Sequence, residues 1–344
     1  MFSAESIRTF RELLRKAHRI TVVSHTHPDG DALGSSTGLV TYIRGVMGKD
    51  AITVLPDTPG ESIRFIVRDA VCPLLCLDAE PDKAIGRIEE SDLLVLIDCN
   101  GFSRTEGLAK AMEASTAKKV LIDHHLNPQV QDFGLVFSTP DISSASELLY
   151  WILKEVEGGE LPLDCCTALM AGMTTDTNNF ANSVFPTTFR MASELIERGV
   201  NRDVLLDKIY REYRENRVRM MGWMQNEGLH ITPDGVAWMV ADEAILRRFD
   251  IREGETEGLV NVPLTIREVR MSFFLKQEDE RTVRVSIRSK KGTSAQQCAV
   301  RHFHGGGHEN AAGGKLIIGE DIASVAEAGA YIERTTHEFL KAGK

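Results

Sequence analysis

Residues 20–35 read ITVVSHTHPDGDALGS, and this stretch determines what we expect of the N-terminal part of the chain. Residues 20–24 predict a short buried strand; a polar loop follows, and apolar side chains then recur at a helical period over residues 32–47. Two further aliphatic runs, LLVLID at 93–98 and KVLID at 119–123, predict strands separated by helical stretches. Continuous aliphatic strands that alternate with helices indicate a parallel sheet covered on both faces. We therefore expect an α/β fold with a doubly wound parallel sheet.

The chain changes character near residue 200. Before that point the sequence also predicts a strand at residues 51–55. It predicts helices at residues 5–18, 143–156, 163–175 and 187–198. Residues 202–227 are highly charged and predict one long helix. After this helix we expect strands at residues 236–241, 269–276 and 281–288, followed by a helix at residues 294–303. These elements predict a smaller C-terminal α+β domain and a cleft between the two domains. We place the boundaries at residues 1–200, 201–228 (a helical linker) and 229–344.

The composition excludes several classes of protein. The 344 residues include 40 basic and 50 acidic side chains, which give a formal net charge of −10. This balance argues against a protein that coats long nucleic acid, although a local basic pocket can still bind a small anion. The aliphatic runs are too short to cross a bilayer, and no secretory signal is evident, so we expect a cytoplasmic protein without membrane association. The six cysteines lack paired CxxC spacing, and we expect them to be buried and reduced.

Polar residues follow three of the predicted strands. His25 comes directly after the first strand, Asp98 closes LLVLID, and Asp123-His124-His125 closes KVLID. In open α/β sheets, ligands bind beyond the carboxyl ends of the strands. We therefore expect these acids and imidazoles to meet at one edge of the sheet.

Two further segments add acidic residues to this set of candidate ligands. Asp29 and Asp31 alternate in the loop after the first strand, and Asp176 follows the apolar helix at 163–173. Mixed carboxylate and imidazole ligands suit Mn²⁺ or a similar divalent ion better than a structural zinc site. Several carboxylates at one edge would repel each other strongly unless cations neutralised them. Two metal ions about 3.5–4 Å apart, bridged by one carboxylate, would do so and could activate a water molecule for in-line attack on phosphorus.

These residues resemble a known family. HTHPDGDALGS at 25–35, Asp98 in LLVLID, DHH at 123–125 and the segment around Asp176 are similar, in order and spacing, to the four motifs of the DHH phosphoesterases. GGGHENAAGG at 305–314 is similar to the GGGHxxAAGG signature of the DHH-associated C-terminal domain. Together these motifs cover nearly the whole chain. Its length, without added nuclease domains, is most similar to the nanoRNase/pAp phosphatase subgroup.

The resemblance implies a catalytic N-terminal domain that binds two divalent ions, with Mn²⁺ preferred and Mg²⁺ or Co²⁺ as alternatives. One ion would be held by His25, Asp29 and Asp98, and the other by Asp31, Asp98, His124 and Asp176. Asp98 would thus bridge the two ions. His125 would face the scissile phosphate and assist the leaving oxygen, while Asp123 would orient the imidazoles. His27 occupies a variable position of the motif, so we expect a structural role for it.

The C-terminal domain would bind substrate. Six basic residues and no acidic ones occur between positions 281 and 301, namely Arg281, Arg284, Arg288, Lys290, Lys291 and Arg301. We expect Arg288 to grip a phosphate, whereas Arg281 and Arg284 fit a solvated strand face equally well. The backbone N–H groups of Gly306 and Gly307, with His308, suit close approach of a nucleotide. His302, His304 and His308 could form a zinc site only with a fourth ligand, which is not evident.

Two residues near the expected metal site are further candidates for substrate contact. Arg104 lies six residues after Asp98, and Asn179 lies three residues after Asp176. Both could reach the substrate, but a capping or turn role fits each of them equally well.

The resemblance implies a manganese-dependent phosphohydrolase of small nucleotides. Its substrates would be short RNA oligomers (nanoRNA), degraded to mononucleotides, and 3'-phosphoadenosine 5'-phosphate, converted to AMP. A linear or cyclic dinucleotide phosphodiesterase (pApA, c-di-AMP) is the main alternative. An inorganic pyrophosphatase would lack the GGGH segment, and a catalytically silent nucleotide sensor would lack a metal ligand, whereas every such position is filled. The family also leads us to expect a homodimer.

Overall fold

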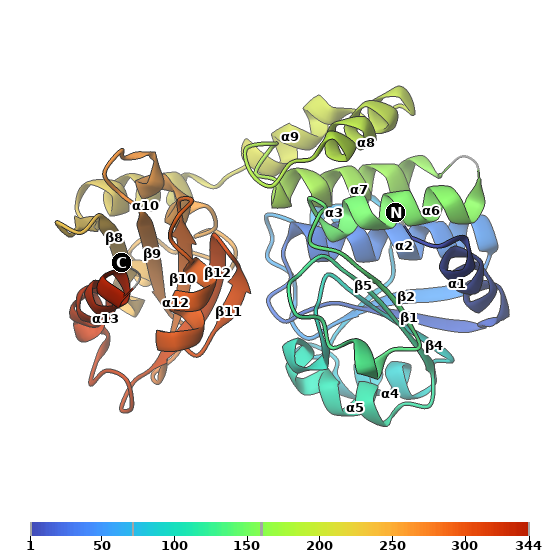
Figure 1. Cartoon of the computed structure of the whole chain (residues 1–344), viewed down its shortest axis with the longest axis horizontal. Helices are drawn as coiled ribbons and strands as arrows, with labels where there is room; N and C mark the ends of the chain where they lie inside the picture. Colours follow the sequence, from blue (N-terminus) through green and yellow to red (C-terminus); the bar gives the residue numbers. More distant parts are fainter. Residues whose placement is uncertain (1, 71, 159–160, 343–344) are drawn as a thin grey trace. The chain divides into compact units, whose positions relative to one another are not determined.

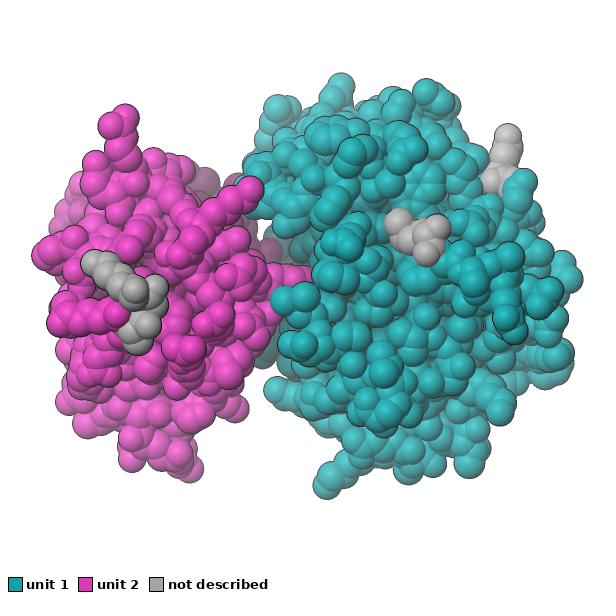
Figure 2. All heavy atoms as spheres, in the orientation of Figure 1, with its two compact units in different colours: residues 1–212 teal, residues 213–344 magenta. Residues whose placement is uncertain are grey.

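The computed structural model describes residues 2–70, 72–158 and 161–342. The chain divides into two compact units, residues 1–212 and residues 213–344, which Figure 2 colours separately. None of the helices in the described residues is both long enough and apolar enough to cross a membrane.

The first unit is built on a sheet of six parallel strands in the order β3-β2-β1-β4-β5-β6. The strands are β1 (Arg19–Val23), β2 (Asp50–Leu55), β3 (Leu74–Cys76), β4 (Leu93–Ile97), β5 (Lys118–Asp123) and β6 (Leu135–Ser138). The central pair β1 and β4 runs in register from Ile20 opposite Leu93 to Val23 opposite Leu96. The strand order reverses between β1 and β4, and such a reversal opens a crevice at the carboxyl ends of the two strands.

Helices cover both faces of this sheet (Figure 1). In β4, Leu93, Val95 and Ile97 belong to the core beneath α1 (Ala4–Lys16), α2 (Gly30–Met47), α6 (Ala145–Glu157) and α7 (Leu163–Asp176). The alternate side chains, Leu94 and Leu96, pack against α4 (Pro81–Glu89) and α5 (Ala109–Ala114). A strand buried on both faces has a continuous aliphatic sequence. The predicted doubly wound parallel sheet is therefore confirmed. The other helices of this unit are α3 (Phe65–Asp69), α8 (Pro186–Glu197), α9 (Arg202–Tyr210) and the 3₁₀ turns η1 (Phe102–Leu108) and η2 (Val130–Asp132).

Two glycines allow α2 and α7 to pack closely. A Cβ atom on Gly34 would lie 2.6 Å from the carbonyl oxygen of Ala168 and 2.6 Å from the Cα of Gly172. A Cβ atom on Gly172 would lie 2.0 Å from the Oγ of Ser146 and 2.9 Å from Oδ1 of Asp31. The close contact therefore fixes where the first turn of α2 lies relative to the last turns of α7.

The second unit contains a mixed six-stranded sheet in the order β11-β12-β10-β9-β8-β7. Its strands are β7 (His230–Ile231), β8 (Val236–Ala241), β9 (Met271–Gln277), β10 (Thr282–Ser289), β11 (Gly306–His308) and β12 (Ala311–Ile317). Its helices are α10 (Glu215–Asn226), α11 (Glu243–Arg248), η3 (Leu259–Thr265), α12 (Ala295–His302), η4 (Val325–Glu327) and α13 (Ala328–Ala342). The β8–β9 pair is parallel and the other pairs are antiparallel. The expected smaller α+β domain is confirmed.

The single helix predicted over 202–227 is wrong. The structure has two helices, α9 and α10, and Arg214 before α10 is extended. Leu205 and Ile209 of α9 are buried in the core of the first unit, whereas Met220 and Met224 of α10 are buried in the second. Because the two halves of the segment pack into different cores, the helix is interrupted between Tyr210 and Glu215.

The glycine-rich segment is a strand pair. Gly306 to His308 form β11, which pairs with Ala311 to Gly313 of β12. A Cβ atom on Gly305 would lie 1.9 Å from the carbonyl oxygen of Gly313, whereas one on Gly306 would meet no heavy atom within 4 Å. The packing of the hairpin therefore requires glycine at position 305, whereas it leaves room for a side chain at position 306.

Replacing Gly34 with alanine should destabilise the protein, because the added methyl group would overlap the α7 backbone. Overpacking of this kind costs about 1–3 kcal/mol. The matched control is Gly86→Ala in α4, where a Cβ atom would meet no heavy atom within 4 Å and alanine favours the helix by about 0.5–1 kcal/mol. Urea denaturation followed by circular dichroism measures both. Equal midpoints for the two variants would contradict this account of the α2–α7 contact.

Candidate metal centre

Residues from five elements meet at the carboxyl ends of β1, β4 and β5. His25 follows β1, and Asp98 directly follows β4. Asp123 is the last residue of β5 and is followed by His124 and His125. Asp29 caps the N-terminus of α2, Asp31 lies in its first turn, and Asp176 is the last residue of α7. The site therefore lies where the strand order reverses.

Asp98 is the central residue of the cluster. Its Oδ1 lies 3.2 Å from Nε2 of His124, and its Oδ2 lies 3.6 Å from Nε2 of His25. The carboxylate is only 2% exposed, yet Oδ1 accepts no hydrogen bond of normal geometry in the described part of the chain. Its backbone has φ = 53°, a left-handed conformation that aspartate tolerates better than most residues. Backbone strain of this kind is concentrated at functional sites.

His25, Asp29 and Asp98 form one group of potential metal ligands, with one ligand atom of each lying within 4.8 Å of the others. The Nδ1 atom of His25 lies 2.7 Å from the carbonyl oxygen of Thr26. Since a carbonyl only accepts, Nδ1 carries the proton and Nε2 is left with a lone pair in the neutral ring. Asp29 accepts hydrogen bonds from the backbone N–H groups of Asp31 and Ala32 through Oδ1 alone.

Asp31, His124 and Asp176 form a second such group. Nε2 of His124 lies 3.8 Å from Oδ2 of Asp31 and 3.8 Å from Oδ2 of Asp176. The buried carboxylate of Asp31 also accepts hydrogen bonds from the backbone N–H groups of Ala145 and Ser146, at 2.6 and 3.0 Å. These two groups begin α6, so the N-terminal end of a helix dipole stabilises the charge of Asp31.

The ionisation of these groups shows that the cluster lacks positive charge. Burial would lower the pKa of His124, but the carboxylates of Asp98, Asp176 and Asp31 outweigh it and raise the pKa to about 10. Burial would raise the pKa of Asp98, but His124 and His25 hold it well below its usual range. For Asp31, burial and then the charges of Asp98 and Asp176 raise the pKa well above normal. Converging carboxylates that hold a proton this tightly are suited to bind divalent cations. Oδ1 of Asp98 is suited to this as well, because it accepts no hydrogen bond of normal geometry from the described residues.

His125 lies beside His124 and is oriented by a buried carboxylate. The rings of His124 and His125 have centroids 4.8 Å apart and an interplanar angle of 63°. Nδ1 of His125 lies 2.8 Å from Oδ1 of Asp123, a buried carboxylate. Donation from Nδ1 to this carboxylate orients the ring.

The structure places Arg104 close to the cluster and Asn179 on a neighbouring turn. Burial lowers the pKa of His25 and the charge of Arg104 lowers it further, but Asp98 and Asp29 outweigh them and raise it. Asn179 has φ = 55°, and its Oδ1 accepts a hydrogen bond of 2.6 Å from Arg202. The side-chain oxygen of Asn179 is therefore already engaged within the first unit.

The predicted substrate residues of the second unit share one edge of its sheet. Arg288 of β10 and His308 of β11 both pair with Ala311 of β12, so they lie in one row across three strands. Side chains directly opposite each other in antiparallel strands project from the same face. The row therefore brings Arg288 and His308 to one face, beside Gly306 and Gly307.

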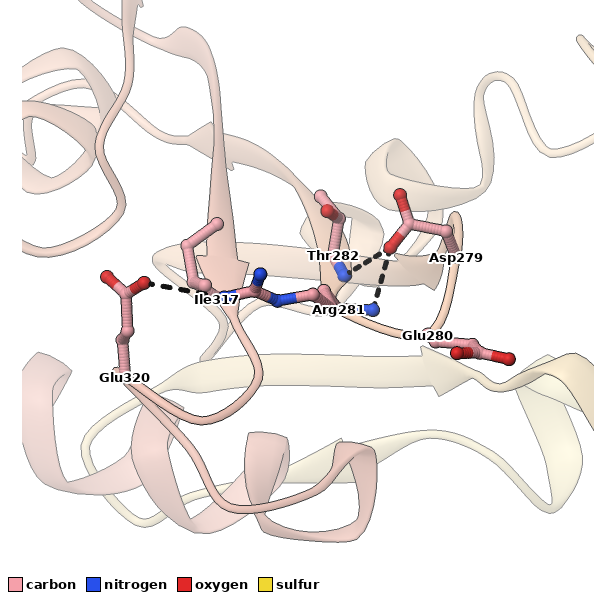
Figure 3. Close-up of a pocket in the computed structure, with 6 residues that line it drawn as sticks. All are labelled: Asp279, Glu280, Arg281, Thr282, Ile317 and Glu320. Atoms are coloured by element: carbon pink, nitrogen blue, oxygen red, sulfur yellow. Dashed lines mark hydrogen bonds and ion pairs between the residues drawn. The ribbon is translucent and has the colours of Figure 1, made fainter.

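Arg281 and Arg284 belong to a solvated strand face rather than to an anion site. Arg284 lies 3.7 Å from a carboxylate oxygen of Glu278, and Arg281 lies 3.8 Å from one of Glu320. Arg281 also borders a hollow of about 640 Å³ at the β9–β10 turn (Figure 3). The hollow is lined by Asp279, Glu280, Arg281, Thr282, Ile317 and Glu320. Three carboxylates and one guanidinium make this hollow a poor phosphate site.

Comparison with known proteins agrees with these features. Residues 19–173 match the DHH family, N-terminal domain, and residues 237–331 match the DHHA1 domain. The chain belongs to the DHH family of phosphoesterases.

Three known proteins are similar to this DHH phosphoesterase over nearly its whole length. It is 29% identical to the bifunctional oligoribonuclease and PAP phosphatase NrnA of Thermus thermophilus, over 98% of this chain and 96% of the relative. It is 26% identical to the cyclic-di-AMP phosphodiesterase GdpP of Geobacillus thermodenitrificans, over 97% of this chain but only 49% of the relative, so it spans about half of that protein. The crystal structure of an exopolyphosphatase-related protein from Bacteroides fragilis superimposes with a TM-score of 0.89 at 29% identity, covering 99% of this chain and 98% of that one.

Two structural supports of the DHH site were missed by the sequence analysis. Asp57, just beyond β2, accepts hydrogen bonds from the loop that carries His25. Its position after an aliphatic strand is the same signal that identified Asp98 and Asp123. The N-terminus of α6 binds Asp31 through backbone groups, for which the sequence contains no local signal.

Binding of Mn²⁺ to the metal-free protein at pH 7 should release at least one proton per chain. With a pKa of about 10, His124 is protonated at pH 7, whereas an imidazole must be neutral to bind a metal. The apparent affinity should therefore increase as the pH rises from 7 towards 10, by up to about tenfold per pH unit for each proton released. Titration calorimetry in buffers of different ionisation enthalpy measures the proton count. Binding without proton release would contradict these assignments.

Proposed function

We propose that this DHH phosphoesterase is a manganese-dependent hydrolase of small nucleotides. It would degrade short RNA oligomers to mononucleotides and convert 3'-phosphoadenosine 5'-phosphate to AMP. The observation that carries the proposal is the cluster of carboxylates and imidazoles around Asp98, because its donor atoms match what Mn²⁺ prefers. The alignment with NrnA over 96% of that relative supports the substrate class.

In this proposal His25, Asp29 and Asp98 hold one ion, and Asp31, Asp98, His124 and Asp176 hold the other. Bound divalent ions supply Lewis-acid polarisation of the phosphoryl group and activation of water. The chain's own groups hold the geometry. Asp98 belongs to the first ligand group and lies 3.2 Å from Nε2 of His124 in the second, and the start of α6 fixes the carboxylate of Asp31.

His125 is the proposed acid for the leaving oxygen. Asp123 accepts from Nδ1, so the protonated ring keeps its second proton on Nε2, from which it can pass to the oxygen that leaves phosphorus. Arg288 and His308, with the open backbone at Gly306 and Gly307, are proposed to hold the phosphate that is not cleaved. Arg104, close to His25, is a further proposed substrate contact.

A phosphodiesterase of linear or cyclic dinucleotides is the second candidate. The alignment with GdpP over 97% of this chain favours it. Because the chemistry at phosphorus is the same for both candidates, only the substrate separates them.

Incubation of the Mn²⁺-loaded protein with a 5'-phosphorylated diribonucleotide should yield mononucleotides, detected by chromatography. Parallel reactions with 3'-phosphoadenosine 5'-phosphate and cyclic di-AMP rank the substrates. Asp98→Asn removes the charge shared by both ligand groups and should lower turnover at least about 100-fold, because metal-ligand sites depend on such charge.

The control for this experiment is Asp279→Asn, which changes a carboxylate of the hollow at the β9–β10 turn and should leave turnover unchanged. An intact dinucleotide after prolonged incubation with the wild-type protein would overturn the nanoRNase proposal. Normal turnover by Asp98→Asn would overturn the assignment of the site.

A further inference from the structure

Thr26 uses each of its polar groups to hold the loop that carries His25. Its backbone N–H donates to the carbonyl oxygen of Arg104 at 2.9 Å. Its hydroxyl donates to Oδ2 of Asp57 at 2.5 Å. Its carbonyl oxygen accepts from Nδ1 of His25 at 2.7 Å. The position of the carbonyl that meets His25 is thus set from two other segments of the chain.

Asp57 accepts hydrogen bonds from two adjacent residues of this loop. Besides the hydroxyl of Thr26, its Oδ2 accepts from the backbone N–H of His27 at 2.6 Å. His27 has φ = 51°, a left-handed conformation that is uncommon for residues other than glycine. A charged acceptor that binds this N–H stabilises the strained turn, and hydrogen bonds to a carboxylate are stronger than those between neutral groups.

The consequence for His25 is the choice of tautomer. A neutral imidazole carries its proton on either nitrogen, and the hydrogen bond made by one nitrogen decides whether the other can bind a metal. The Thr26 carbonyl selects the form with the proton on Nδ1. Nε2, which lies 3.6 Å from Oδ2 of Asp98, then has its lone pair directed towards the cluster.

We propose that Thr26 and Asp57 are positioning residues that hold His25 in its Nδ1-protonated tautomer and thereby set its affinity for a divalent cation. This inference rests on the metal ligands of the proposed function and extends them to residues that do not contact the cation. Asp57 belongs to none of the groups of potential metal ligands found among the described residues.

The chain offers a matched control for this contact. The hydroxyl and the backbone N–H of Thr58 donate to the two carboxylate oxygens of Asp78, both at 2.9 Å. This is a similar pairing of threonine with aspartate, and Thr58 directly follows Asp57 in the chain. Thr58→Val and Asp78→Ala therefore measure the general cost of removing such a pair.

The test compares Thr26→Val, Asp57→Ala and Asp57→Asn in the full-length chain. Loss of a residue that orients a metal ligand typically weakens metal binding about 10–100-fold. We expect this loss of Mn²⁺ affinity, measured by calorimetry, for Thr26→Val and Asp57→Ala. Asp57→Asn retains an acceptor and should recover part of the affinity, and the two control variants should bind Mn²⁺ as the wild type does.

A second measurement separates positioning from general stability. The ¹⁵N chemical shifts of the His25 ring in the metal-free protein, recorded at a pH where the ring is neutral, report the tautomer directly. Wild type should show the Nδ1-protonated form alone, and Thr26→Val a mixture of both. Unchanged shifts together with unchanged Mn²⁺ affinity in Thr26→Val would overturn the proposal.

These readouts involve no nucleotide. A wild-type protein that binds Mn²⁺ but hydrolyses no nanoRNA would overturn the proposed substrate and leave the tautomer result standing. If Asp57→Ala fails to fold, the isosteric Thr26→Val, which keeps both backbone contacts, decides the question.

Discussion

The mutual repulsion of three carboxylates around one buried imidazole is the constraint on which the structure of this site depends. Asp31, Asp98 and Asp176 all lie within 4 Å of Nε2 of His124. Two of them are almost completely buried, where charges interact strongly and water screens little. Such an arrangement is stable only if positive charge compensates it. The metal-free protein meets this need with a proton on His124, and divalent cations would meet it better.

Several features of the first unit hold these charged side chains in place. The strand order of the sheet places the loops after β1, β4 and β5 side by side. The close contact of α2 with α7 at Gly34 and Gly172 helps to bring Asp31 and Asp176 within 3.8 Å of Nε2 of His124. The N-terminus of α6 lends two backbone donors to Asp31. Each support is rigid secondary structure, which holds ligands more accurately than a loop would.

Sequence patterns predicted those features that depend on local chemistry. The central strands β4 and β5 are aliphatic throughout because both faces are buried, so their ends, and with them Asp98 and His124, could be located. Residues 202–227 misled us because a charged helical period does not reveal which of two cores each half will enter. The backbone partners of Asp31 and Thr26, at the start of α6 and at Arg104, could not be predicted, since backbone groups distant in sequence leave no local pattern. The sequence left two roles open for Arg281, an anion site and a solvated strand face, because Glu320, which lies 3.8 Å from its guanidinium, comes from another segment.

The central claim is that Asp98 joins two cation sites, and diffraction tests it most directly. Crystals soaked in MnCl₂ and measured near the manganese absorption edge locate each bound ion by its anomalous signal. The account predicts two ions per chain, one beside His25 and Asp29 and the other beside His124, Asp31 and Asp176, with Asp98 in contact with both. A single ion, or two ions that Asp98 does not contact, would contradict it.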